Sequence, residues 1–200
     1  VLRICERAGV RPYTALDPRE VVARSGSRVH LAGVLETRAA IVQPAALVRG
    51  LRRVALERGV RIFEHTRVRR FTRGRPVRLT TAGGTVRAER LVIATNAWAA
   101  SLREFWTRLA VISSDLVATA PIPEELDRLG WERDLSLTDS QTMVDYYRLS
   151  REGRVVFGKG GWTIALGGRI GTVFDRSAAR AAEVTADLHR YYPALKTVPI

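Results

Sequence analysis

The sequence contains few of the residues that cross-link small proteins or bind metals. Cys5 is the only cysteine among 200 residues, which excludes a disulfide framework and a thiolate metal cluster. His30, His65 and His189 stand far apart, without metal-ligand spacing. We predict no metal site, and the single cysteine favours a reduced, cytoplasmic setting.

Long apolar runs are also lacking. No stretch approaches the ~20 apolar residues that a membrane-spanning helix needs. Arg3, Glu6 and Arg7 interrupt what would be the apolar region of a signal peptide. We therefore expect no membrane partner for this chain.

Lysine is scarce although the chain is strongly basic. Lys159 and Lys196 are the only lysines, yet 33 basic residues against 20 acidic ones give a net charge of +13. Such a charge is typical of nucleic-acid-binding proteins. The arginines are spread along the whole chain without forming a basic arm, so a solvated surface is favoured. We expect no nucleic-acid partner, and a nucleic-acid-binding domain remains an alternative that rests on charge alone.

With 46% apolar and 26% charged residues, the chain is typical of a globular protein of one domain or one and a half. Capping and apolar periodicity predict one helix from Asp17-Pro18 to about Arg24, and another from Pro44 to Gly59. Short strands are expected at 60–63 and 68–71, followed by a hairpin around 82–84.

The run Leu91-Val92-Ile93-Ala94 is continuously apolar, which predicts a strand buried on both faces. The succession favours a parallel strand order with a β-meander inserted before this last strand. In the second half we expect a strand at 111–118 broken at 113–115, strands at 144–149 and 155–157, and a helix at 175–191. These elements predict a mixed sheet with a covering helix, and the glycine-dense stretch 158–171 is predicted to be a mobile loop.

Small and polar residues follow the predicted buried strand directly. In open α/β sheets, ligands bind beyond the carboxyl ends of the strands. Ala94, Thr95 and Ala97 are small enough for a dinucleotide to approach their backbone, and Asn96 tolerates unusual dihedral angles. Trp98 ends this run. The alternative is an ordinary strand-to-helix turn.

The order of these elements resembles the D-amino-acid oxidase-like family of FAD-dependent oxidoreductases, which includes glycine, sarcosine and glutamylputrescine oxidases. The resemblance covers roughly residues 30–160. It starts at the helix opening at Gln43-Pro44 and continues through Thr66-Arg67-Val68 and the hairpin to the run that ends at Trp98.

The resemblance implies an α/β fold with a partial, Rossmann-like FAD-binding domain, an inserted β-meander and a mixed-sheet substrate-binding domain. The first domain would take residues 1–105, with substrate-domain elements near 17–43, and the second residues 106–200. It also implies that the backbone at Val68 contacts the adenine of FAD. Ala94, Thr95, Asn96, Ala97 and Trp98 would pack against its pyrophosphate and ribose. Many members carry Gly where this chain has Asn96, which puts a close approach there in doubt.

In the second half, Tyr146, Tyr147 and Arg148 are the candidates for binding a substrate carboxylate, Arg through a bidentate pair. Neighbours on a strand point to opposite faces, so only one side of this trio can serve a pocket. The alternative is that the tyrosines pack in a core and the arginine lies in solvent.

The G-x-G-x-x-G fingerprint of dinucleotide-binding folds and a closing glycine-rich segment are absent from the sequence. We therefore expect an incomplete chain that carries part of an FAD site. The implied activity is oxidation of the C–N bond of an amine or amino acid by hydride transfer to flavin, with oxygen as acceptor. The alternative is a truncated, non-catalytic fragment of such an oxidase.

Overall fold

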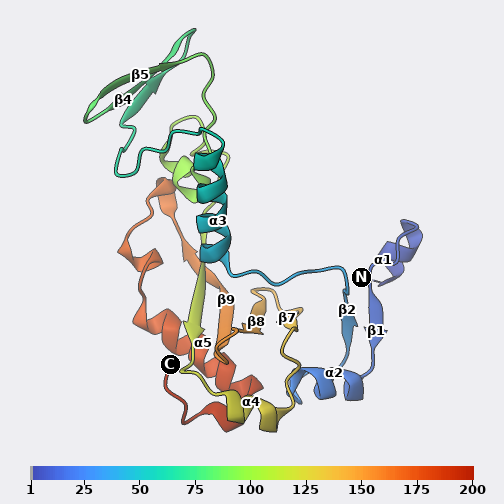
Figure 1. Ribbon diagram of the computed structural model, residues 1–200. Coiled ribbons are helices and arrows are strands. Elements are labelled where there is room, and N and C mark those ends of the chain that lie inside the picture. The colour runs from blue at the N-terminus through green and yellow to red at the C-terminus, as the bar shows by residue number, and fades with distance from the viewer. Residues whose placement is uncertain (1) are drawn as a thin grey trace. The chain divides into compact units, whose positions relative to one another are not determined.

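The computed structural model describes residues 2–200, with the side chain of Trp162 outside the description. The chain divides into two compact units, one formed by residues 42–99 and the other by residues 1–41 together with 100–200. Figure 1 shows a mixture of helices and small sheets in the chain. In the described residues every strand pairing is antiparallel.

The larger unit is built on a four-stranded sheet in the order β6-β9-β8-β7. Its strands are β6 (Ile112–Ala118), β7 (Ser136–Thr138), β8 (Asp145–Leu149) and β9 (Val155–Ile164). A register shift between Ile112 and Ser114 marks an irregularity in the β6–β9 pairing. Around the sheet lie α4 (Pro123–Leu129), α5 (Ala178–Tyr191) and three short 3-10 helices, η2 (Leu166–Gly168), η3 (Thr172–Phe174) and η4 (Pro193–Leu195).

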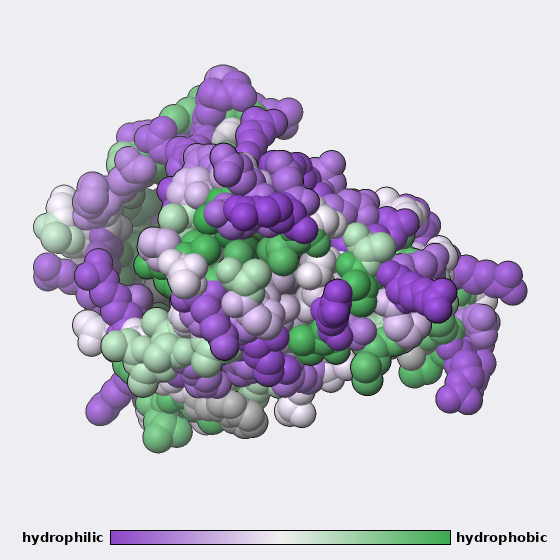
Figure 2. Space-filling view, turned by 90° about the horizontal axis from the view of Figure 1, so that it is seen from below, coloured by the Kyte–Doolittle hydropathy of each residue, from purple (hydrophilic) through white to green (hydrophobic). Residues whose placement is uncertain are grey.

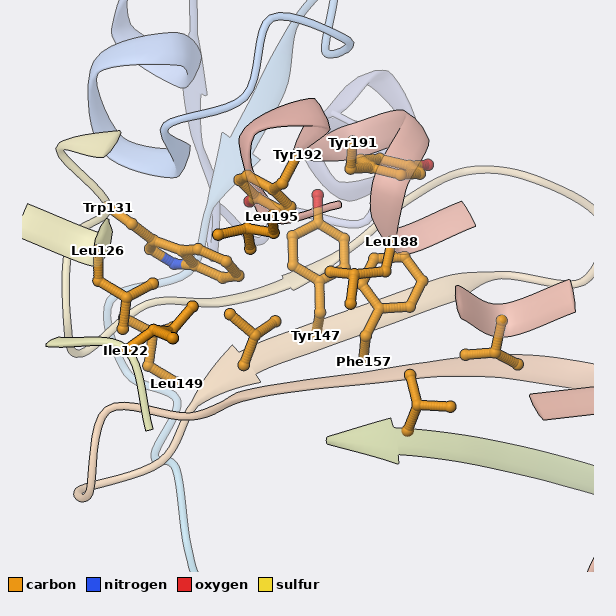
Figure 3. Packing of buried hydrophobic residues seen from close by; sticks show 13 residues of the cluster. Ile122, Leu126, Trp131, Tyr147, Leu149, Phe157, Leu188, Tyr191, Tyr192 and Leu195 are labelled. Atoms are coloured by element: carbon orange, nitrogen blue, oxygen red, sulfur yellow. The ribbon is translucent and has the colours of Figure 1, made fainter. Parts of the chain in front are cut away.

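One face of this sheet forms the hydrophobic core. Alternate residues of β8 are buried, as expected for a strand with one face covered. Helix α5 packs against β6 and β9 on that face, and its N-cap Ser177 accepts a hydrogen bond from the Arg180 amide. Figure 3 shows the aromatic and aliphatic side chains that fill the space between them. The cluster comprises Val117, Ile122, Leu126, Trp131, Tyr147, Leu149, Val155, Phe157, Val184, Leu188, Tyr191, Tyr192 and Leu195.

The N-terminal part of the larger unit contains α1 (Leu2–Arg7), β1 (Thr14–Leu16), α2 (Pro18–Ser25) and β2 (Gly33–Leu35), with β1 and β2 paired. Helix α2 begins with a complete capping box between Asp17 and Glu20. The C-terminal end of α2 docks on the core, because the Tyr192 hydroxyl donates to the carbonyl of Ser25, the last residue of α2, at 2.8 Å.

The smaller unit contains α3 (Pro44–Glu57) and a three-stranded meander of β3 (Arg70–Thr72), β4 (Val77–Thr81) and β5 (Gly84–Ala88). Pro44 occupies the first turn of α3, and the Gln43 side chain accepts from the Ala46 amide at 2.6 Å. A 3-10 helix, η1 (Asn96–Ser101), follows the meander. The predicted helix at 44–59 and the inserted β-meander are confirmed.

Two predicted strands are wrong. Residues 60–63 form no strand, and neither does the Leu91–Ala94 run, which pairs with no strand among residues 2–200. The side chain of Val92 is 85% exposed, so a strand buried on both faces is not formed. Burial on both faces needs neighbouring strands and covering helices, and the meander supplies neither to this run. For the same reason the expected parallel strand order is not formed in the described residues.

The second half differs from expectation in two details. The sheet is antiparallel in all its described pairings, where a mixed sheet was expected. Gly158, Gly160 and Gly161 lie within β9, where a mobile loop was expected. Pairing of β9 with strands on both sides supplies the backbone hydrogen bonds that hold this glycine-rich segment extended.

The surface agrees with a solvated, arginine-rich chain. On the face shown in Figure 2, hydrophilic residues cover most of the area, with small hydrophobic patches between them. Several arginines pair with exposed carboxylates, such as Arg24 with Glu132 at 2.7 Å. No helix in the described part of the chain has the length and apolar character to cross a bilayer.

Candidate functional site

The face of the sheet opposite the core carries two of the three predicted substrate-binding residues. Tyr146 and Arg148 are partly buried, whereas Tyr147 between them is only 1% exposed and belongs to the core. We call the side of the sheet that bears Tyr146 and Arg148 the open face. The alternation along β8 therefore separates the trio as the geometry of a strand requires.

Tyr146 is held across its neighbouring strand. Its hydroxyl lies 2.6 Å from the Ser114 Oγ on β6, although β9 runs between β8 and β6. The ring crosses β9 at Gly158, which pairs with Tyr146 on one side and Leu116 on the other. A Cβ atom at Gly158 would come within 3.0 Å of the Tyr146 ring carbons, so only glycine leaves room for this ring position.

Arg148 supplies a positive charge to the same face. The only described hydrogen bond of its guanidinium goes to the adjacent carbonyl of Leu149 at 3.5 Å, which is a weak contact. Among the salt bridges of residues 2–200, none involves Arg148. A guanidinium with unused donors can bind a carboxylate through two parallel hydrogen bonds.

Tyr147 points the other way, into the core. Its ring stacks on Phe157 with centroids 4.9 Å apart, and its hydroxyl forms a hydrogen bond with the Nε2 of His30. Burial raises the pKa of Tyr147 well above its ordinary value, and the nearby Tyr191 hydroxyl raises it further. Tyr147 therefore stays a neutral phenol and serves the core, as the alternative interpretation had it.

Beneath β8 and β9 lies a cluster of buried charges. The Nζ of Lys159 lies 3.1 Å from Asp145 Oδ1 and 2.7 Å from Asp187 Oδ2. The side chain of Asp145 is fully buried, and burial raises its pKa despite its hydrogen bond with Lys159. Burial by itself would lower the pKa of Lys159, but its hydrogen bonds with the two aspartates raise it. This cluster ties α5 to the inner side of the two strands that carry Tyr146 and Gly158.

A hollow of about 450 Å³ opens beside the edge strand β6, next to the start of α5. Ser114 and Leu116 line it, together with residues 174–178, but Tyr146 and Arg148 do not. The unpaired guanidinium of Arg148 is thus on the open face and not in this hollow, so we place the candidate substrate site on the open face.

The predicted cofactor residues all fall in the smaller unit. Ala94, Thr95, Asn96 and Trp98 are exposed, and Ala97 is partly buried at the start of η1. Asn96 has a φ of 46°, a left-handed conformation that non-glycine residues seldom adopt. Asn96 stands where many family members carry glycine. Its left-handed backbone conformation is one that glycine adopts readily and that asparagine tolerates.

The backbone of this segment is available to a ligand. No strand ladder of the described residues includes residues 91–95, and in the turn the Trp98 amide donates to the Thr95 carbonyl at 3.1 Å. Val68 precedes β3 in an unpaired stretch and is 45% exposed, where a strand position was expected. Backbone outside any strand ladder and the small side chains of Ala94, Thr95 and Ala97 suit the phosphate and sugar groups of a dinucleotide, so this segment fits the predicted cofactor.

Sequence reasoning missed Ser114, Gly158, His30 and Lys159. Gly158 stood in the glycine-dense stretch, and its pairing with Tyr146 depends on the register of β8 and β9. His30 meets Tyr147 across 117 positions of sequence, a contact for which no local pattern exists. Groups of three or more His, Cys, Asp or Glu that could hold a metal ion are absent from the described residues.

Comparison with known proteins supports one family. A family model described as FAD dependent oxidoreductase matches residues 2–200. The chain is 30% identical over 199 residues to Probable oxidoreductase OrdL of Rhizobium meliloti, covering 97% of this chain and 43% of that protein. It is 24% identical to Gamma-glutamylputrescine oxidoreductase of Escherichia coli, covering 98% of this chain and 44% of that protein.

The fold agrees with a solved structure. Glycine oxidase from Geobacillus kaustophilus superimposes with a TM-score of 0.73 at 20% identity, over 99% of this chain and 51% of that one. The chain thus spans about half the length of the proteins it matches. The expected fold class and the resemblance on which it rested are confirmed, and the chain belongs to the family of FAD-dependent oxidoreductases.

Proposed function

We propose that the protein carrying this chain oxidises the carbon–nitrogen bond of an amine or amino acid. The observation that carries the proposal is the open face, where Arg148 has unused donors on the same side of β8 as Tyr146, whose hydroxyl pairs with Ser114. The relative from Escherichia coli is named for an amine, gamma-glutamylputrescine. FAD, when bound, accepts the hydride from the carbon beside the nitrogen.

The residues of the chain would bind and orient the substrate. Arg148 would hold a substrate carboxylate through its guanidinium, and Tyr146 would add a hydrogen bond from the same face. We assign no general base to the described residues, since a deprotonated amine needs none to deliver hydride. Val68 and the five residues from Ala94 to Trp98 would contact FAD through their backbone.

The remaining assignments are part of the same proposal. Cofactor binding would belong to residues 1–105, with substrate-side elements near 17–43, and substrate binding to residues 106–200. We propose oxygen as the acceptor that reoxidises the flavin, and the cytoplasm as the setting. The alternative is that these 200 residues have no activity by themselves. The match to the Rhizobium meliloti relative covers 97% of this chain but only 43% of that protein.

The test is purification of the protein with the sequence that flanks this chain in its gene. We expect a yellow protein with a flavin spectrum that bleaches anaerobically on addition of an amine or amino acid. Peroxide release in air, abolished by catalase, would support oxygen as acceptor. A colourless protein, or a flavin that no amine or amino acid reduces, would refute the proposed reaction.

Arg148→Met tests the role of the charged group. Losing hydrogen bonds to a charged partner weakens binding by about 10- to 100-fold. We expect the KM for amino acids to rise by about this factor, with a much smaller change for an amine that lacks a carboxylate. Arg128→Met, on the exposed face of α4, is the matched control. Equal effects of the two variants would contradict the assignment.

A further inference from the structure

The position of Tyr146 depends on two residues from different strands. Its ring lies over the backbone of β9 at Gly158, and its hydroxyl reaches Ser114 on β6. A strand side chain normally stands roughly perpendicular to its sheet. Here the ring instead lies down across a neighbouring strand, and this needs both an empty position beneath it and a partner at its far end.

Gly158 provides the empty position. A Cβ at this residue would fall within 3.0 Å of the Tyr146 ring and of the Leu116 side chain, closer than real Cβ atoms come. Leu116 is 58% exposed and its end can move aside, whereas the ring is held by its hydroxyl. Gly160, two residues further on the same side of β9, is different, because its Cβ would meet Met143 at 3.5 Å, an ordinary contact.

Ser114 provides the partner. The two hydroxyls carry two protons, and the bond between them at 2.6 Å uses one. One proton therefore remains for an acceptor on the open face, whichever oxygen donates within the pair. A carboxylate is the acceptor that also matches the positive charge of Arg148, which stands two residues from Tyr146 on the same side of β8.

We propose that Ser114 and Gly158 are positioning residues that hold the Tyr146 hydroxyl where it binds a substrate carboxylate. This inference rests on the proposed function. It makes Gly158 a determinant of carboxylate binding although it has no side chain, and Ser114 a determinant that acts through the phenol. Neither residue is charged. We therefore expect them to affect only how well the Tyr146 hydroxyl is ordered and the direction of its hydrogen bond to the carboxylate.

The test is the Kd of propionate for the flavin-loaded protein, measured by calorimetry, with propylamine as the ligand that lacks a carboxylate. Freeing a side chain that must be ordered again weakens binding by about three- to tenfold, which we expect for Ser114→Ala. Ser114→Thr keeps the hydroxyl and should stay within about twofold of the parent. Ser140→Ala, an exposed serine in the loop between β7 and β8, is the matched control.

Gly158→Ala should weaken propionate binding by about tenfold, as much as Tyr146→Phe does, whereas Gly160→Ala should have little effect. In a Tyr146→Phe background, Gly158→Ala should add less than about twofold, because residues acting through one group are not additive. Propylamine binding should be unchanged in all of them. Urea midpoints of each variant separate loss of fold from loss of binding, and Ser114→Ala keeps the test decisive if Gly158→Ala does not fold.

Three results would overturn the inference. One is a normal Kd in Ser114→Ala and Gly158→Ala while Tyr146→Phe weakens binding, which leaves the proposed function intact. Another is equal weakening by Gly158→Ala and Gly160→Ala. The third is a normal Kd in both Tyr146→Phe and Arg148→Met, which would show that the open face does not bind the carboxylate. Whether amino acids reduce the flavin would then decide separately whether the proposed reaction stands.

Discussion

Replacing Lys159 by Met should destabilise the larger unit strongly, because it leaves a buried charge without its main partner. Lys159 bridges Asp145, whose side chain is fully buried, and Asp187, which is 19% exposed. Methionine fills a similar volume but cannot neutralise either carboxylate. Removing one partner of a buried ion pair costs about 3–5 kcal/mol.

The structure places the expected effect at the lower end of that range. Arg190 remains 3.3 Å from Asp145 and 3.2 Å from Asp187, and its side chain is 46% exposed. It can compensate part of the loss, so we expect about 3 kcal/mol. With a urea m-value of about 1–3 kcal/mol/M, the midpoint should fall by about 1–3 M.

The assay is urea unfolding followed by tryptophan fluorescence, since Trp131 is buried in the core of the same unit. Arg133→Met is the control, because its ion pair with Asp127 is shorter, 2.6 Å, but exposed on both sides. Exposed pairs contribute about 0–1 kcal/mol. Adding Asp145→Asn to Lys159→Met should recover part of the stability, since it removes the stranded charge. Equal losses from Lys159→Met and Arg133→Met would refute the argument that burial decides the energy.

Three further effects follow from local structure. Burial lowers the pKa of His30 from 6.5, although Asp139 opposes this, so the folded state binds the proton less tightly than the unfolded state. The urea midpoint should therefore fall as pH drops below about 6.5, and His30→Gln should flatten that part of the profile. Asp17→Ala removes the capping box of α2 and should cost about 1 kcal/mol in thermal or urea unfolding. Gly168 has a φ of +69°, and a new Cβ there would lie within 3.0 Å of backbone atoms, so Gly168→Ala should lower the free energy of unfolding by about 1–3 kcal/mol. A Cβ at Gly171 would meet open space, so Gly171→Ala should change it by no more than about 0.5 kcal/mol. A pH profile unchanged by His30→Gln, a neutral Asp17→Ala, or equal losses at the two glycines would each contradict its prediction.

Local signals in the sequence were sufficient where a few neighbouring residues determine the structure. The Asp17 cap of α2, the proline at the start of α3 and the hairpin at 77–88 all form as expected. Each depends on contacts within a few positions of the chain. The family resemblance also came from such elements, through their order.

Long-range pairing decided what the local signals could not. The Leu91–Ala94 run has the composition of a doubly buried strand, yet in these residues it has no strand beside it. In the opposite sense, the glycine-rich stretch at 158–161 has weak strand propensity, but it forms part of β9, an inner strand with a neighbour on each side. Propensity is overridden in both cases by the presence or absence of neighbours.

The sequence by itself determined the family, the helices and hairpins, and the rule that Tyr146 and Arg148 share one side of a strand while Tyr147 takes the other. Only the tertiary structure decided which side is the core, because that depends on where α5 packs. It also decided that Tyr146 lies over Gly158 toward Ser114, since this requires the registers of three strands at once. Alternation is a property of every strand, but register and packing belong to the whole sheet.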